Sequence, residues 1–317
     1  MNEKLRVHSK NPESSFLGEV IWSPVKSIWF LSNLLLALFV APFYFSLSSI
    51  IVFLILTAIT LCFGHSLGMH RLMIHRSYEC PRWMEYLFVY LGVLVGMSGP
   101  IGMLKQHDLR DWAQRQSKCH DYLLHGSSII KDAWWQLNCD LKLKYPPIFT
   151  IEDRILKSKF YTSVEKTWLL HPLVLAMPLY ILGGLPWLLW GVCVRVVVSV
   201  GGHWLVGYFA HNHGQKTWHI NGAAVQGHNI KLAGFVSMGE SWHNNHHAYP
   251  RSAMLGLHDD EPDIGWFFLN VLHNLGYVIN IKLPEDLPER PELMPESGNG
   301  KIKFRKEFKS CKFAKTA

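Results

Sequence analysis

The sequence has few cysteines and few charged residues for its length. Its 317 residues include six cysteines with no Cys-x-x-Cys pair, which is typical of reduced thiols and excludes a disulfide scaffold. Charged residues make up 17%, below the roughly 25% of soluble domains. Glycine-rich dinucleotide-binding, His-Glu-x-x-His and nucleic-acid-binding motifs are also absent. The net charge of +7 therefore indicates contact with an anionic membrane surface rather than with nucleic acid.

Two long segments lack charge altogether. No Lys, Arg, Asp or Glu occurs from Ser27 to Met69 or from Thr167 to Val194, and the second apolar run continues to Phe209. A membrane-spanning helix needs about 20 apolar residues. We expect an all-α integral membrane protein with two transmembrane hairpins, whose spans cover residues 28–47, 50–69, 168–182 and 187–209. The alternative is the buried core of a soluble protein, which such long uncharged runs disfavour.

The basic residues predict the orientation of these spans. Lys26 precedes the first hairpin, Arg71 and Arg76 follow it, and the two hairpin turns carry no charge. The positive-inside rule then puts both termini and the polar middle of the chain in the cytoplasm. We expect a cytoplasmic N-terminal segment (1–27), a membrane domain (28–282) and a mobile tail (283–317) that becomes basic after Gly300.

The chain contains 18 histidines, and some of them form three clusters beside the expected spans. His70 and His75 follow the second span, His107 lies in the polar middle, and the last cluster is His243, His246 and His247. Helical offsets of 0, 3 and 4 fall within about 100° of arc, so the last cluster can converge on one place. An offset of five leaves two rings about 140° apart, which suits two metals or a helix end that bends.

These clusters can meet only if they lie on the same side of the membrane. The chain must therefore cross the membrane an even number of times between any two of them. The apolar stretch from Tyr86 to Leu104 should therefore not cross the membrane once, and we expect a helical cap on the cytoplasmic side to hold the metal site. Imidazole suits Zn, Cu, Fe and Ni, and more than four convergent imidazoles imply two metals. A lipid methylene has no acidic proton, so only a strong metal–oxygen oxidant can remove its hydrogen.

The chain resembles the membrane fatty acid desaturases of the acyl-CoA type. The matching motifs are His70-Arg71-Leu72-x-x-His75-Arg76-Ser77-Tyr78 and Gly239-Glu240-x-Trp242-His243-Asn244-x-His246-His247-x-x-Pro250. The resemblance implies two Fe2+ ions, O2 as co-substrate and a fatty acyl substrate. It also implies a further ligand on the last span, a place that His203 fits, with Ser199 where the family has a water-holding asparagine.

The second histidine box departs from the family pattern His-x-x-His-His. Here the segment reads His107-x-x-Arg110-Asp111. Asp111 is a candidate iron ligand, with a salt bridge to Arg110 or Arg115 as the alternative. Arg110 has no lone pair for a metal, and both arginines are weak candidates for anion binding. Further candidate ligands, or groups that orient ligands, are His120, His125, Ser199 and Glu240.

These features predict an O2-dependent di-iron desaturase of a long acyl chain. Two electrons per turnover would come from a separate ferredoxin or small cytochrome with its reductase, because no dinucleotide or haem domain is recognisable. The altered second box leaves two alternatives open, a lipid hydroxylase on the same scaffold and a non-catalytic membrane protein with a partly lost metal site. We expect a multi-pass protein of a bacterial plasma membrane.

Overall fold

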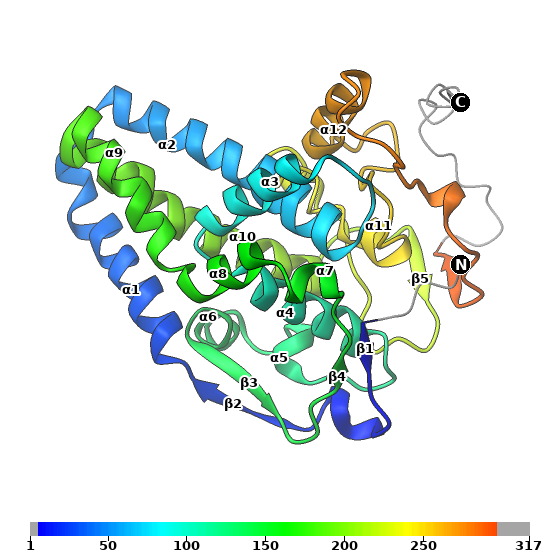
Figure 1. Ribbon diagram of the computed structural model, residues 1–317. Coiled ribbons are helices and arrows are strands. Elements are labelled where there is room, and N and C mark those ends of the chain that lie inside the picture. The colour runs from blue at the N-terminus through cyan, green and yellow to red at the C-terminus, as the bar shows by residue number, and fades with distance from the viewer. Residues whose placement is uncertain (1–5, 297–317) are drawn as a thin grey trace.

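Long apolar helices gather at one end of the molecule (Figure 1). The computed structural model describes residues 6–296. After α1 (Pro24–Phe39), α2 (Leu47–Ile59) continues directly into the π-helix η3 (Thr60–Ile74). Later in the chain, α9 (Leu170–Leu188) continues through the π-helix η4 (Leu189–Val194) into α10 (Arg195–Asn212).

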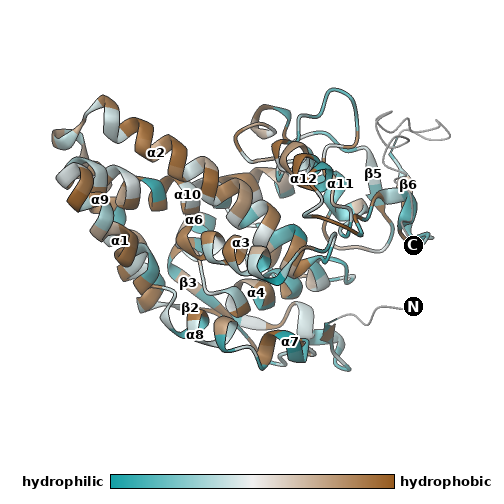
Figure 2. Ribbon diagram, turned by 45° about the horizontal axis from the view of Figure 1, so that its top comes forward, coloured by the Kyte–Doolittle hydropathy of each residue, from teal (hydrophilic) through white to brown (hydrophobic). Residues whose placement is uncertain are grey.

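Two of these continuous helices have the length and composition to cross a membrane. They run from Leu47 to Ile74 and from Leu170 to Asn212. Many of their large apolar side chains face outwards: Leu47 is 75% exposed and Ile181 is 77% exposed. Figure 2 shows how apolar residues dominate α2 and its neighbours. Such a surface is unfavourable in water and favourable in lipid, so the protein is a membrane protein and a soluble core is not supported.

The chain turns between its apolar helices at one common end. Gly184 interrupts α9 with φ 62° and ψ −157°, a backbone conformation that glycine adopts without strain. Close by, the indole of Trp187 donates a hydrogen bond to Ser48 Oγ at 3.1 Å, and that of Trp190 donates to the Ala41 carbonyl at 3.1 Å. Ala41 lies in the short 3-10 helix η2 (Ala41–Tyr44), which joins α1 to α2. The two turns therefore lie side by side.

The rest of the described chain is mostly helical, but it is not all-α. Three two-stranded antiparallel sheets pair β1 with β4, β2 with β3, and β5 with β6, and each joins segments far apart in the chain. The expectation of an all-α fold is corrected to this extent. The strands are β1 (Val7–His8), β2 (Gly18–Trp22), β3 (Cys139–Leu143), β4 (Ile148–Phe149), β5 (Trp218–Ile220) and β6 (Leu293–Pro295).

Helices of 4 to 15 residues surround the end of η3. They include α3 (Arg82–Leu94), α4 (Pro100–Gln114), α5 (Asp121–Leu124), α6 (Ile129–Asn138), α7 (Asp153–Leu156), α8 (Lys159–Thr167), α11 (His243–Ala248) and α12 (Ile264–Asn274). Besides η2, the described chain has the 3-10 helices η1 (Pro12–Ser15), η5 (Lys231–Ala233) and η6 (Pro284–Asp286).

Glycines allow α3 to lie directly against η3. A Cβ atom on Gly64 would lie 2.4 Å from the backbone of Leu91, and one on Gly68 would lie 2.6 Å from the backbone of Phe88. Real side chains do not pack this closely, so only glycine permits this approach. The apolar stretch 86–104 is divided between α3 and α4 and forms no single long helix.

Buried ion pairs fasten the end of η3 to distant segments. The Arg71 guanidinium donates to Asp263 Oδ1 at 2.8 Å and to the Ala253 carbonyl at 2.7 Å, and both charged groups are enclosed. Arg6, just before β1, donates to the Ile74 carbonyl at 2.7 Å and to Glu152 Oε2 at 3.0 Å. Separating the partners of such a pair would leave an uncompensated charge, which is costly. The pairs therefore fix the position of the segment between residues 70 and 75.

The segment after residue 283 forms secondary structure as far as it is described. It forms η6 and then β6, which pairs with β5. Arg290 also donates to the carbonyls of His247 and Ala248 at 2.9 and 2.8 Å. These bonds hold residues 284–296 against α11. The first five residues of the expected N-terminal segment and the basic stretch within 297–317 lie outside the described residues.

Candidate metal centre

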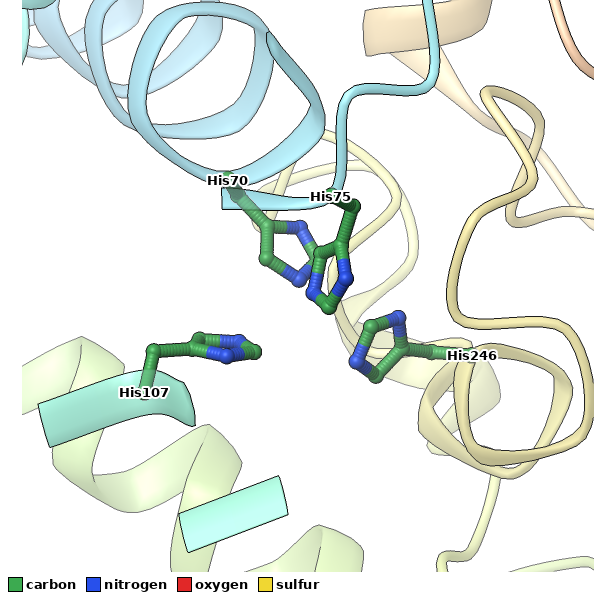
Figure 3. A group of neighbouring side chains, drawn as sticks. All are labelled: His70, His75, His107 and His246. Carbon is green, nitrogen blue, oxygen red and sulfur yellow. The ribbon is translucent and has the colours of Figure 1, made fainter. Parts of the chain in front are cut away.

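Seven imidazoles form two adjacent groups at the end of the apolar helices. In each group, one potential ligand atom per residue lies within 4.8 Å of the others. The first group contains His70, His75, His107 and His246, contributed by η3, α4 and α11, and Figure 3 shows their rings turned toward one another. The second group contains His211, His243 and His247, from α10 and α11. The ring centroids of His243 and His246 are 5.5 Å apart, so the two groups are neighbours.

The π-helix explains how His70 and His75 reach the same place. An α-helix would leave rings five residues apart on different sides, but a π-helix bonds residue i to residue i+5. The His75 amide donates to the His70 carbonyl at 3.0 Å, and the two ring centroids are 4.7 Å apart. The helix also ends at this point, as one of the two expected arrangements required.

The histidines of α11 divide between the groups rather than converging on one point. His243 and His247 are four residues apart and their Nε2 atoms lie 3.1 Å apart, whereas His246 joins the first group. On a helix, an offset of four displaces a ring by about 40° in one direction and an offset of three by about 60° in the other. One short helix therefore serves both groups.

The structure brings His211, and not His203, to the second group. His211 Nε2 lies 3.1 Å from His243 Nε2, and its Nδ1 lies 2.7 Å from the Gly207 carbonyl. That carbonyl can only accept, so Nδ1 carries the proton, and the lone pair of Nε2 accepts a hydrogen bond from the Gln114 amide at 3.0 Å. His203, two turns earlier on α10, packs against His65 with ring centroids 4.8 Å apart. The feature of the sequence that could have identified His211 as a ligand is its position. It lies in the last turn of the helix, at the end where the other histidine clusters lie.

Asp111 lies beside the first group. Its carboxylate oxygens are 3.7 Å from Nδ1 of His107, 3.9 Å from Nε2 of His246 and 4.0 Å from Nε2 of His75. Arg115 lies 3.6 Å away on the same helix. Burial raises the pKa of Asp111, but the nearby His107 and Arg115 lower it by more than burial raises it. The pKa of Asp111 therefore lies below its usual value. The carboxylate is therefore ionised and within reach of three imidazoles.

Glu240 lies beside an imidazole of the first box. Its Oε2 lies 2.6 Å from Nδ1 of His70, and its Oε1 accepts a hydrogen bond from Ser66. Burial raises the pKa of Glu240, but the neighbouring His70 and Arg71 lower it more, so the side chain remains a carboxylate. This close approach of the carboxylate to Nδ1 leaves Nε2 of His70 for the centre of the group.

Three further candidates lie around the groups without joining them. The ring of His120 accepts a hydrogen bond from the amide of Tyr122 and caps α5. His125 bonds to Arg110 and Asp132. Ser199 is buried on α10, four residues before His203. Arg110 does not pair with Asp111 and points towards α5 and α6.

The donor atoms of the first group fit a bound metal ion. Nε2 of His75, Nδ1 of His107 and Nε2 of His246 are buried and have no hydrogen-bond partner in the described part of the chain. Burial lowers the pKa of His75 and His246 well below the ordinary value and lowers the pKa of His107 and His247 to about 4. Neutral imidazoles with unused lone pairs, beside one carboxylate, are the donors that first-row transition metals prefer.

Comparison with known proteins identifies the family. The chain is 30% identical to the acyl-CoA 5-desaturase AL21 of Anemone leveillei over 255 residues, which are 79% of this chain and 77% of the relative. It is 31% identical to the sn-2 palmitoyl-lipid 9-desaturase of Nostoc sp. over 242 residues (74% and 82%). This chain belongs to the membrane fatty acid desaturases. No protein-family model matches it.

Other desaturases share the similarity over most of their length. The sn-1 stearoyl-lipid 9-desaturase of Synechocystis sp. is 31% identical over 250 residues, which are 77% of this chain and 75% of that protein. Desaturases are oxidoreductases, so this chain is an enzyme of that class.

Proposed function

We propose that this desaturase introduces a double bond into a long fatty acyl chain with two iron ions and O2. The observation that carries the proposal is the pair of adjacent imidazole groups at the end of the apolar helices, the first of which has buried and unpartnered nitrogens. The overall reaction is –CH2–CH2– + O2 + 2 e− + 2 H+ → –CH=CH– + 2 H2O. Two hydrogens leave the acyl chain, and both oxygen atoms of O2 are reduced to water.

One iron would be held by His70, His75, His107, His246 and Asp111. The other would be held by His211, His243 and His247, and this assignment takes His211 in place of His203. Bound iron would supply the O2 activation that removal of hydrogen from an unactivated methylene requires.

The chain's own residues hold these donors in position. Glu240 keeps the proton of His70 on Nδ1, and the Gly207 carbonyl does the same for His211. Arg290 donates to the carbonyls of His247 and Ala248 and so fixes the last turn of α11. Partners of this kind set ring orientation and typically change metal affinity by about 10- to 100-fold.

The acyl chain would enter from the bilayer between apolar helices. We place the two hairpins, α1 with α2–η3 and α9 with η4–α10, across the membrane, with both turns on one side and the metal centre and both termini on the cytoplasmic side. The shared end of the two turns, at Trp187–Ser48 and Trp190–Ala41, supports this arrangement. The polar helices between the hairpins would form the cytoplasmic cap.

The electron donor would be a separate protein, a ferredoxin or small cytochrome with its reductase. We place the enzyme in a bacterial plasma membrane and assign residues 28–282 to the membrane domain. Named relatives act on acyl-CoA or on glycerolipids, and either carrier would present the same acyl chain to the centre.

Hydroxylation is the second candidate, and the altered second box favours it. Asp111 changes the donor set of the first group, and Arg110 brings a positive charge near the second. A centre with different donors can release a hydroxylated chain instead of removing the second hydrogen.

Lipid profiling of cells that express the gene tests both candidates. New double bonds that disappear in a His107→Gln variant support the desaturase, whereas hydroxylated chains support the alternative. Iron analysis of the purified protein adds an independent check, with about two irons per chain expected for this donor set. No lipid change together with no bound iron would leave only the non-catalytic alternative.

A further inference from the structure

Arg110 and Asp111 are neighbours on α4, yet their side chains go to different places. Nη1 of Arg110 lies 2.7 Å from Nε2 of His125 and donates to the Leu123 carbonyl at 2.9 Å. Its Nη2 donates to Gln136 Oε1 at 2.9 Å. Asp111 instead lies among the imidazoles of the first group, and no ion pair joins the two side chains in the described part of the chain.

His125 is held in place by a buried carboxylate. Its Nδ1 lies 2.8 Å from Oδ2 of Asp132, which is fully buried and also accepts a hydrogen bond from the Trp204 indole at 2.8 Å. Because the carboxylate accepts the Nδ1 proton, Nε2 of His125 has its lone pair free to accept from Arg110. Asp132, which lies at the opposite side of the ring from Arg110, thus sets the tautomer of His125.

The same unit touches the second imidazole group. The ring of His125 stacks on the ring of His211, with centroids 5.2 Å apart and an interplanar angle of 20°. Asn212 donates to the His125 carbonyl at 3.1 Å. Asp132, His125 and Arg110 therefore form one chain of contacts that runs from α6 to the metal centre.

A released Arg110 would have an obvious alternative partner. A guanidinium and an adjacent carboxylate in a poorly solvated site attract each other strongly, and a bidentate pair uses the carboxylate lone pairs. A carboxylate engaged in this way is a poorer metal ligand, because the arginine occupies the lone pairs and opposes the ion's charge.

We propose that Asp132 and His125 act as a restraint that holds Arg110 away from Asp111 and so keeps the Asp111 carboxylate available to the metal. Both are positioning residues: they act on the metal through Arg110. The inference rests on the proposed function, because it takes Asp111 as an iron ligand.

Rescue by a second substitution tests the restraint. The purified full chain is titrated with Fe2+ against a chromophoric chelator, as wild type and as the variants His125→Leu, Arg110→Gln and His125→Leu/Arg110→Gln. We expect His125→Leu to bind Fe2+ at least about tenfold more weakly, which is the size typical of losing a partner that positions a ligand. The double variant should regain most of this loss, because the guanidinium that competes for Asp111 is gone.

A double variant as weak as His125→Leu would overturn the restraint, since His125 would then act as a ligand itself or through the fold. Wild-type affinity in His125→Leu would overturn it as well. If His125→Leu does not fold, Asp132→Asn with and without Arg110→Gln gives the same comparison. A wild-type chain that binds no iron overturns the proposed function and the restraint together, whereas failed rescue in an iron-binding chain overturns the restraint alone.

Discussion

Oε2 of Glu240 lies 2.6 Å from Nδ1 of His70, although 170 residues separate them in the sequence. The carboxylate comes from the loop before α11, and the imidazole comes from the last π-turns of η3. Ser66 donates to the other carboxylate oxygen at 2.5 Å, and Arg71 Nε lies 3.7 Å from it. This contact couples the first histidine box to the segment that carries the third, so the two boxes are positioned together.

Replacing Glu240 by Gln should weaken metal binding while leaving the fold in place. The amide keeps the shape of the side chain but loses the charge that makes His70 a stronger donor, and an affinity loss of about tenfold or more is expected. Competition with a chelator measures the change. Asp260→Asn is the matched control, because Asp260 is an exposed carboxylate paired with Lys231. Equal affinity in Glu240→Gln and wild type would contradict a role for Glu240 in orienting the ligand.

His211 and His203 should differ sharply when each is replaced by Gln. His211→Gln removes a nitrogen that lies 3.1 Å from His243 Nε2, so the second metal should be lost and the iron content should fall by about half. His203→Gln alters a ring that packs on His65 and should leave the iron content near that of wild type. Metal analysis of the two purified variants decides the matter. Loss of iron in His203→Gln alone would return the ligand role to His203.

Much of the centre could be predicted from the sequence because its residues occur in short, dense motifs. His70, His75, His107, His243, His246 and His247 were all identified as candidate ligands, and all six lie in the two groups. The family prediction is confirmed by the relatives. Local spacing was enough for most of these, since the first and third motifs each contribute two or three rings from one short segment.

The remaining features depend on long-range contacts or on unusual backbone. Reasoning from a period of 3.6 residues cannot anticipate a π-helix, so the closeness of His70 and His75 could be stated only as one alternative. A single histidine such as His211 has no motif around it, and only its place at the end of α10 distinguishes it from His203. A salt bridge from Arg110 to Asp111 was one of the alternatives in the sequence, but the acceptors of Arg110 on α5 and α6 could not be seen there.

Asp111 should be replaceable by histidine but not by asparagine. Asp111→Asn removes the charge and leaves a weak amide donor beside His75, His107 and His246, so Fe2+ affinity should fall by about tenfold or more. Asp111→His restores an imidazole at the altered position of the second box and should retain the metal. Both variants are compared with wild type by metal content and chelator competition. If Asp111→Asn binds iron as tightly as wild type, the carboxylate serves Arg115 and is not a ligand.

The ion pair between Arg6 and Glu152 should give a pH-dependent stability. Burial raises the pKa of Glu152, but the hydrogen bonds and charge of Arg6, with Arg76 nearby, lower it more, so the net pKa lies below 4.5. A carboxylate with a depressed folded-state pKa stabilises the fold above its unfolded pKa, and the effect is lost as the pH falls through the folded value. Glu152→Gln should therefore unfold at a temperature roughly 2–5 °C lower at pH 7, which corresponds to about 1–2 kcal/mol.

Thermal unfolding of the metal-free protein in detergent provides the measurement for this pair. The difference between wild type and Glu152→Gln should be constant above about pH 5 and should shrink towards pH 3. Asp153→Asn is the control, because that carboxylate is exposed and pairs with Lys157, the residue directly after α7. A difference that persists unchanged at low pH would mean that the carboxylate charge is not what stabilises the fold.

The close contact between η3 and α3 makes glycine substitutions a test of how the first box is supported. Alanine at Gly64 or Gly68 would place its Cβ 2.4 or 2.6 Å from the α3 backbone, so α3 must move away from the helix that ends in His70 and His75. We expect each substitution to cost about 1–3 kcal/mol and to weaken metal binding. Gly201→Ala is the matched control, because nothing lies within 4 Å of its added Cβ and α10 should be stabilised by up to about 1 kcal/mol. Thermal unfolding and Fe2+ titration of the three variants should therefore separate the effect of the backbone contact from that of helix propensity. A Gly68→Ala protein as stable as Gly201→Ala would contradict the close contact between η3 and α3.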